Sequence, residues 1–144
     1  MTCRPTKSSS NANDLFMPTE STIIEAIKAQ FSIKTNERFL KPEWKKRHRE
    51  SNVASTGFCY VATHAYFELM GGKSSNLVIK KWVDTPNPID GHFWVEKESG
   101  EIVDLTADQY PNGFKHYAEG IISNRSSKNA KKFTNVVREF LDND

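Results

Sequence analysis

Three side chains of this 144-residue sequence could form the working parts of a thiol enzyme. Cys59 lies near the start of one apolar segment, His92 opens a later one, and Asp104 lies in the segment after that. A cysteine thiolate is a nucleophile, a histidine can act as its base, and a carboxylate can orient the histidine ring. The order of these residue types predicts nucleophilic catalysis through a thioester.

The segment around Cys59, "STGFCYVATHAYFELMGGK", has the apolar spacing of a helix. Ser55 or Thr56 is expected to cap its start, and Gly71–Gly72 to end it. The residues at helical spacing that should face the core are Phe58, Val61, Ala62, Ala65 and Leu69. Cys59 then lies in the first turn, where unpaired N–H groups and the helix dipole favour a thiolate and can hold a developing oxyanion.

His92 and Asp104 belong to two short strands, "HFWVE" and "EIVDLT", that are expected to form a hairpin. If the connection is Glu98-Ser99-Gly100, with Gly100 in the left-handed conformation, position 94 pairs with 104 and 92 with 106. His92 and Asp104 then share a face as diagonal neighbours. A two-residue connection would turn Asp104 to the opposite face. Catalysis therefore requires the three-residue connection.

The motifs "GFCYVA" (57–62), "GHFWVE" (91–96) and "IVDLT" (102–106) resemble the three core motifs of the transglutaminase-like branch of papain-fold thiol enzymes. The resemblance implies that Cys59 is the nucleophile, His92 the general base and acid, and Asp104 the orienting carboxylate. It implies a peptidase, deamidase or acyltransferase that acts on an amide, isopeptide or thioester bond without a cofactor. Leu105 stands where the family has proline, and no arginine follows Gly71–Gly72.

Other residues near these motifs have structural explanations beside functional ones. Ser55, Thr56 or Gln109 could supply a second oxyanion donor, although capping and packing are alternative roles. Trp94 is expected to wall the site and Glu96 to be solvated. His64 lies about 140° around the helix from Cys59, so we assign it to the surface or to packing.

Alternatives to the thiol enzyme remain open at this point. Cys59 alone is also typical of a buried core thiol. Cys59, His92 and Asp104 could bind zinc, but the paired ligands at short spacing that such sites usually have are missing. The chain could also be a catalytically idle papain-fold protein that binds or inhibits a protein partner. The basic stretches 41–49 and 125–132 suggest a weaker possibility, RNA binding.

The rest of the sequence predicts an α+β domain over 19–144, preceded by a flexible tail over 1–18. A helix with a Thr19 cap and an apolar stripe is expected from "PTESTIIEAIKAQF", and a loop or short helix with Trp44 packed on the core from "LKPEWKKRHRE". "NLVIKKWVD" should form a strand. "ADQY", "YAEGII" and "AKKFTNVVREFL" are expected to be helical, the last with a stripe of Phe133, Val136, Val137 and Phe140. The resemblance adds a papain-like or transglutaminase-like core, with the nucleophile helix packed on a small antiparallel sheet.

Composition sets the broad class of protein. With 37% hydrophobic and 26% charged residues, the chain has an ordinary globular profile. The formal net charge of +2 argues against a protein devoted to nucleic-acid binding. The sequence shows neither a long apolar run nor the apolar core of a signal peptide. We therefore expect a cytoplasmic protein with a protein or peptide substrate, no membrane contact, and Cys59 as a free thiol rather than paired with Cys3.

Overall fold

The computed structural model describes residues 18–87 and 90–143. The predicted tail, except Pro18, and Cys3 lie outside these residues, so the structure does not bear on them. The described part is a mixed α+β structure with a four-stranded antiparallel sheet in the order β3-β2-β1-β4. None of the helices in the part that the structure describes is long and apolar enough to cross a membrane.

The elements follow one another in an order that places most helices before the sheet. The α-helices are α1 (Glu20–Ala29), α2 (Pro42–Glu50), α3 (Cys59–Leu69) and α4 (Lys128–Asp142). The strands are β1 (Val78–Trp82), β2 (His92–Glu96), β3 (Ile102–Val103) and β4 (Ile121–Ile122). Short 3-10 helices cover Lys34–Phe39 (η2), Gly72–Ser75 (η3), Ala107–Gln109 (η5) and Tyr117–Glu119 (η6).

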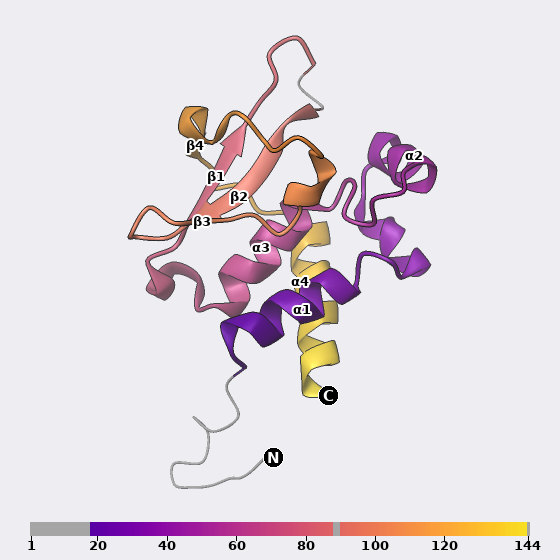
Figure 1. Ribbon diagram of the computed structural model, residues 1–144. Helices are drawn as coiled ribbons and strands as arrows, with labels where there is room; N and C mark the ends of the chain where they lie inside the picture. Colours follow the sequence, from indigo (N-terminus) through magenta and orange to yellow (C-terminus); the bar gives the residue numbers. More distant parts are fainter. Residues whose placement is uncertain (1–17, 88–89, 144) are drawn as a thin grey trace, which may run out of the picture.

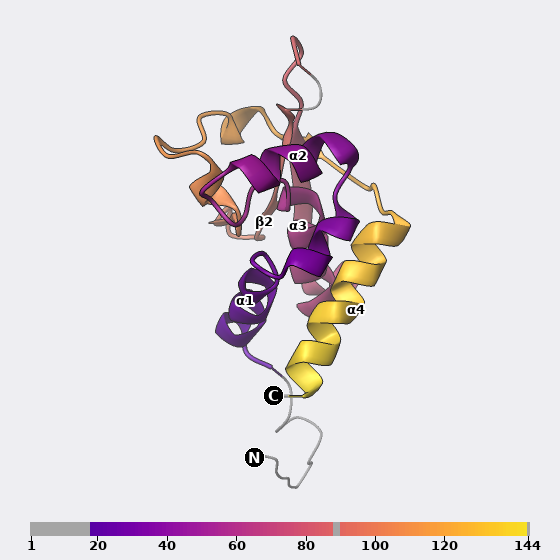
Figure 2. The same cartoon turned by 90° about the vertical axis from the view of Figure 1, so that its right-hand side faces the viewer.

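Helix α3 is the centre of the molecule. It contacts β1 and β2 on one side and packs against α1 and α4 on the other, as the two views of the ribbon show (Figures 1 and 2). Its buried residues run almost all the way round, from Cys59 through Tyr66, with Tyr60 as the partly exposed member. A helix enclosed on this scale is held by apolar burial, so its first residue is carried on a rigid support.

The flanking helices agree with the sequence in most details. Thr19 caps α1 by accepting a hydrogen bond from the backbone N–H of Thr22 at 3.2 Å. Ile23, Ile27 and Phe31 are buried as expected. In α4 the expected inclusion of Phe140 in the buried stripe is wrong, because its side chain is 38% exposed. The buried line passes through Ala130, Phe133 and Val137, whose spacing leads to Leu141 instead.

The segment between β3 and α4 is mostly irregular, which corrects the expectation of helix in "ADQY" and "YAEGII". Only the single 3-10 turns η5 and η6 form there, and Ile121–Ile122 becomes strand β4. β4 pairs with Lys80 and Lys81 and so satisfies backbone groups at that edge of β1. Pro111, Gly113 and Gly120 interrupt any longer helix.

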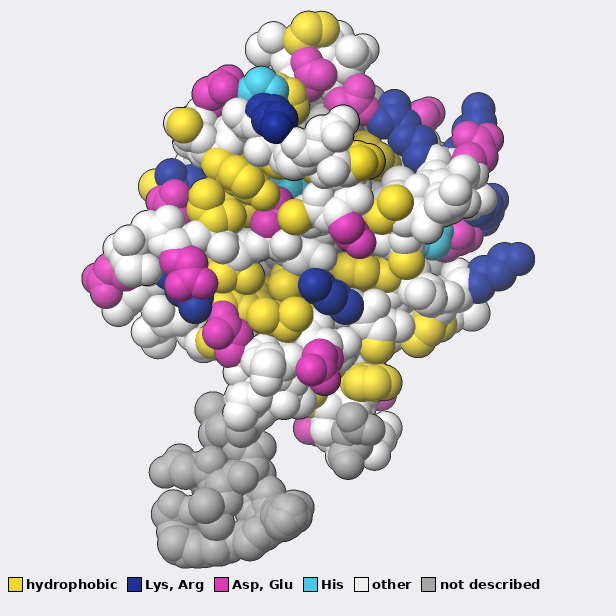
Figure 3. All heavy atoms as spheres, in the orientation of Figure 1, with side chains coloured by type: hydrophobic (Ala, Val, Ile, Leu, Met, Phe, Trp, Pro, Cys, Tyr) yellow, Lys and Arg dark blue, Asp and Glu magenta, His cyan; other side chains and the backbone are white. Residues whose placement is uncertain are grey.

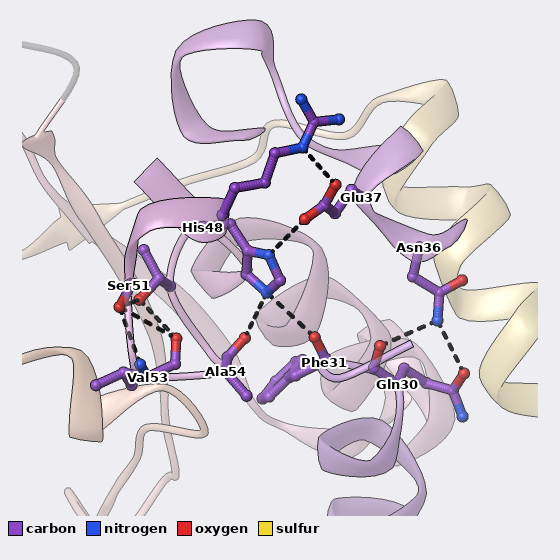
Figure 4. A network of polar contacts seen from close by, with 10 residues as sticks. Gln30, Phe31, Asn36, Glu37, His48, Ser51, Val53 and Ala54 are labelled. Atoms are coloured by element: carbon purple, nitrogen blue, oxygen red, sulfur yellow. Dashed lines mark hydrogen bonds and ion pairs between the residues drawn. The ribbon is translucent and has the colours of Figure 1, made fainter. Parts of the chain in front are cut away.

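Helix α2 is attached by polar contacts, since none of its residues is buried. Its anchor is His48, whose Nδ1 lies 2.9 Å from Glu37 Oε2 and whose Nε2 lies 3.2 and 3.0 Å from the carbonyls of Phe31 and Ala54 (Figure 4). Arg49 adds an ion pair with Glu37. Trp44 packs on the core as expected, so this network positions an aromatic wall.

Candidate functional site

The hairpin has the register that the candidate site requires. Val95 pairs with Val103 and Glu96 with Ile102, which makes Glu98-Ser99-Gly100 the connection. Lys97 N–H donates to Glu101 O at 2.8 Å, and Gly100 has φ +94°, in the left-handed region that a residue with a Cβ rarely adopts. Of the two connections that the sequence left open, the three-residue one forms. It places His92 and Asp104 on one face.

His92 and Asp104 form a buried pair. His92 Nε2 lies 2.7 Å from Asp104 Oδ2, and the side chains are 0% and 5% exposed. Thr106 N–H donates to Asp104 Oδ1 at 3.1 Å, and the Tyr117 hydroxyl donates to Oδ2 at 2.6 Å. The carboxylate is therefore held on both oxygens, and it holds the ring in turn.

The pKa of His92 reflects its two polar neighbours. Burial by itself lowers this pKa, but the hydrogen bond with Asp104 and the interaction with the Cys59 thiol raise it to about 9, from an ordinary value of 6.5. The thiol therefore lies within interaction distance of the ring. Nδ1 of His92 is buried and makes no well-directed hydrogen bond among the described residues. It is the ring nitrogen that the pairing with Asp104 leaves free.

Cys59 is the first residue of α3 and is 7% exposed. It is a free cysteine. It lines a cavity of about 190 Å³, which we call the Cys59 cavity, between the start of α2 and the end of β1. Cys59 therefore lies at the boundary between the core, in which it is mostly buried, and this cavity.

The expected side-chain cap of α3 is wrong. Phe58 occupies the cap position, and no side chain there accepts a hydrogen bond. The Ser55 hydroxyl instead donates to Asp108 Oδ1, and the Thr56 hydroxyl donates to Val53 O at 2.8 Å. The N–H groups of the first turn, which lack partners within a helix, are thus not covered by a side-chain cap.

Gln109 differs from Ser55 and Thr56 in having a free donor. Its Oε1 accepts a hydrogen bond from Gly57 N–H at 3.2 Å, which fixes the orientation of the amide. Its Nε2 is buried and has no partner among the described residues. Of the three candidate oxyanion donors named from the sequence, Gln109 is the one whose donor is not already used.

The other residues singled out have structural positions. Trp94 is completely buried behind His92, with ring centroids 5.9 Å apart, so it supports the ring from inside. Glu96 forms an ion pair with Lys80 at 3.5 Å. His64 is 7% exposed and packs near Tyr60, and burial lowers its pKa. The described residues include no group of three His, Cys, Asp or Glu side chains arranged to hold a metal ion.

Sequence reasoning missed two aromatic contributors. Tyr117 donates to Asp104, and the Tyr110 ring lies edge-on to His92 with centroids 4.9 Å apart. Both come from the segment after β3 that was expected to be helical. A lone tyrosine at an unknown distance from the hairpin has no spacing signal, so only the fold identifies these two residues.

Comparisons with protein-family models, with curated proteins and with solved structures found no match for this chain. What the site can do is therefore inferred from its own geometry. An oriented, buried histidine beside a thiol at a helix start, open to a cavity, is an arrangement suited to acyl transfer.

Proposed function

We propose that this protein is a cysteine-nucleophile hydrolase or acyltransferase that acts on an amide, isopeptide or thioester bond. Cys59 is the nucleophile, His92 the general base and acid, and Asp104 the orienting carboxylate, on a papain-like or transglutaminase-like core. The observation that carries the proposal is the buried His92–Asp104 pair at 2.7 Å, with the second ring nitrogen left for the Cys59 thiol.

The chemistry uses these three groups in sequence. The pKa of about 9 for His92 favours an imidazolium at neutral pH, beside the sulfur of the proposed nucleophile. The sulfur attacks the carbonyl carbon, and the collapse of the tetrahedral intermediate breaks the bond to the leaving nitrogen or sulfur, which receives the proton of His92. Water or an amine then attacks the thioester and gives its proton to His92, and the Cys59 thiolate departs.

The oxyanion of the tetrahedral intermediate is held by two donors in this proposal. One is the backbone N–H of Cys59, in a first turn without a side-chain cap. The other is Nε2 of Gln109, which is buried beside Gly57 with its hydrogen-bonding capacity unused. A preorganised donor of this kind contributes more than a group that must reorient during the reaction.

The test is the rate of alkylation of Cys59 by iodoacetamide, followed by intact mass in a Cys3→Ser background so that one thiol reacts. We expect the folded protein to react at about pH 6 at least tenfold faster than the same chain in denaturant, because the thiolate is favoured beside His92. His92→Gln should remove this advantage while the circular dichroism spectrum stays unchanged. Equal rates in the folded, denatured and His92→Gln proteins would refute the triad.

Electrophilic amide and ubiquitin-like probes, tested on the same protein, identify the acyl group that Cys59 accepts. They also separate catalysis from the alternative of an idle binding or inhibitor protein. A catalyst loses its biological effect in Cys59→Ala, whereas an idle binding protein retains it.

A further inference from the structure

Two basic stretches that are far apart in the sequence meet at the Cys59 cavity. Lys41, at the start of α2, and Arg125, before α4, both line it, together with Lys81 of β1. The remaining wall is largely aromatic, with Trp44, Tyr60, Trp82 and Phe93. On the molecular surface, several Lys and Arg side chains gather over the side where α2 lies (Figure 3).

The three cations of the cavity are available to a ligand. Within the part of the chain that the structure describes, Lys41, Lys81 and Arg125 make no ion pair. By contrast, Arg47 and Arg49 of the same basic stretch are neutralised by Glu43, Asp90 and Glu37. The Arg125 guanidinium is held 4.7 Å above the Tyr60 ring. None of the described residues that line the cavity is a carboxylate.

A second hollow, of about 590 Å³, adjoins the Cys59 cavity and is of mixed charge. The two share Trp44 and Trp82, but the second hollow carries the carboxylates of Glu50, Asp84 and Asp90 beside Arg47 and Lys115. A long polyanion such as RNA that crossed both hollows would meet these carboxylates. A ligand with a local negative charge matches the arrangement better.

We infer that the group bound in the Cys59 cavity is an acidic segment of a protein or peptide. This inference rests on the proposed function, and it adds the chemical class of the substrate. Glutamate or aspartate side chains next to the reacting carbonyl would pair with Lys81 and Arg125, while the apolar part of the segment packs on Trp44 and Trp82. Nucleic acid offers phosphate for the same cations but lacks the amide carbonyl that Cys59 is proposed to attack.

The experiment measures whether short peptides protect Cys59 from iodoacetamide, again in the Cys3→Ser background. A glutamate-rich peptide is compared with its glutamine counterpart and with an oligouridine. Iodoacetamide is uncharged, so its own approach does not depend on the cations. We expect the glutamate peptide to slow alkylation about threefold more than the glutamine peptide, as for a few exposed ion pairs. The difference should vanish in about 1 M NaCl.

Matched variants distinguish peptide binding in the Cys59 cavity from a general effect of the protein's net charge. Arg125→Glu should abolish protection by the glutamate peptide, whereas Arg138→Glu, on the exposed side of α4, should leave it intact. Equal protection by both peptides, or equal loss in both variants, would overturn the inference. Stronger protection by oligouridine than by the glutamate peptide would overturn it in favour of nucleic acid. The alkylation rate without peptide, and its dependence on His92, test the proposed function separately.

Discussion

At the scale of single residues, the site is defined by which hydrogen-bonding groups are already used. Both carboxylate oxygens of Asp104 are hydrogen-bonded, to His92, Thr106 and Tyr117. The Ser55 hydroxyl donates to Asp108 in η5, and the Thr56 hydroxyl donates to Val53 O in the loop before α3. Within the described residues, the buried side-chain atoms without a partner are Nδ1 of His92, Nε2 of Gln109, the Tyr60 hydroxyl, Nδ1 of His64 and Nε1 of Trp94. Buried polar groups without partners are uncommon. Nδ1 of His92 belongs to the proposed triad, and Gln109 is held by Gly57, two residues before Cys59.

Gln109 gives a prediction that distinguishes oxyanion binding from loop support. Gln109→Glu retains an oxygen that can accept from Gly57 N–H but lacks the Nε2 donor. We expect the acyl-transfer rate constant kcat to fall about 100-fold with little change in KM. Alkylation by iodoacetamide, which forms no oxyanion, should continue. A change confined to KM, or a parallel loss of alkylation, would assign Gln109 a binding or structural role instead.

At the scale of elements, the hairpin turn decides whether His92 and Asp104 can meet. Deleting Glu98 leaves a two-residue connection, which shifts β3 by one position and turns Asp104 away from His92. We expect the enhanced alkylation of Cys59 to be lost while the molecule stays folded. Glu98→Ala keeps the length of the turn and should keep the reactivity. Retention of fast alkylation in the deletion variant would show that the register does not control the site.

The contact between Gly120 and Trp94 connects the segment between β3 and α4 to the side chain that packs against the His92 ring. A Cβ at position 120 would lie 2.8 Å from Cη2 of Trp94 and closer still to Cζ2. Gly120→Ala should therefore lower the free energy of unfolding by about 1–3 kcal/mol. Trp94→Phe removes the clashing atoms, so the double variant should be more stable than the sum of the two single changes predicts. If the two single changes lower the free energy of unfolding by amounts that simply add in the double variant, the contact between Gly120 and Trp94 is contradicted.

Most of the helices and strands were predictable from sequence, and the features that were predicted wrongly or missed have a common cause. Local patterns predicted α1, α3, the strand around Val78–Trp82, the hairpin and the α+β class, and left the register of the hairpin open between two connections. The cap of α3, the short strand β4 and the role of Tyr117 were not predictable, because each depends on a partner distant in sequence. Ser55 turns to Asp108, β4 pairs with β1, and Tyr117 reaches Asp104.

At the scale of the whole molecule, the His92–Asp104 pair links stability to pH. The pKa of His92 in the folded protein is about 9, above its ordinary value of 6.5. The stabilisation of the folded state by protonated His92 is therefore fully present below about pH 6.5 and is lost as the pH rises through about 9. The free energy of unfolding changes by on the order of 3 kcal/mol over this range, because each unit of pKa is equivalent to about 1.4 kcal/mol.

The comparison that isolates this contribution is with Asp104→Asn. Urea denaturation from about pH 6 to pH 10 should show the stability advantage of the wild type shrinking as the pH rises, since His92 gives up its proton. Groups that titrate equally in both proteins cancel in the difference. Two parallel curves across this range would mean that Asp104 does not raise the pKa of His92.

The attachment of α2 has a consequence for how the protein comes apart. The proposed nucleophile is carried by a helix enclosed in apolar side chains. Helix α2, whose Trp44 lines the same cavity, is held by one imidazole, a few charged groups and the packing of Trp44 itself. Mild urea or a His48→Ala change should therefore detach α2 while Cys59 stays in place. Backbone amides of α2 would then exchange with deuterium well before those of α3, and peptide protection would disappear before the thiol loses its reactivity.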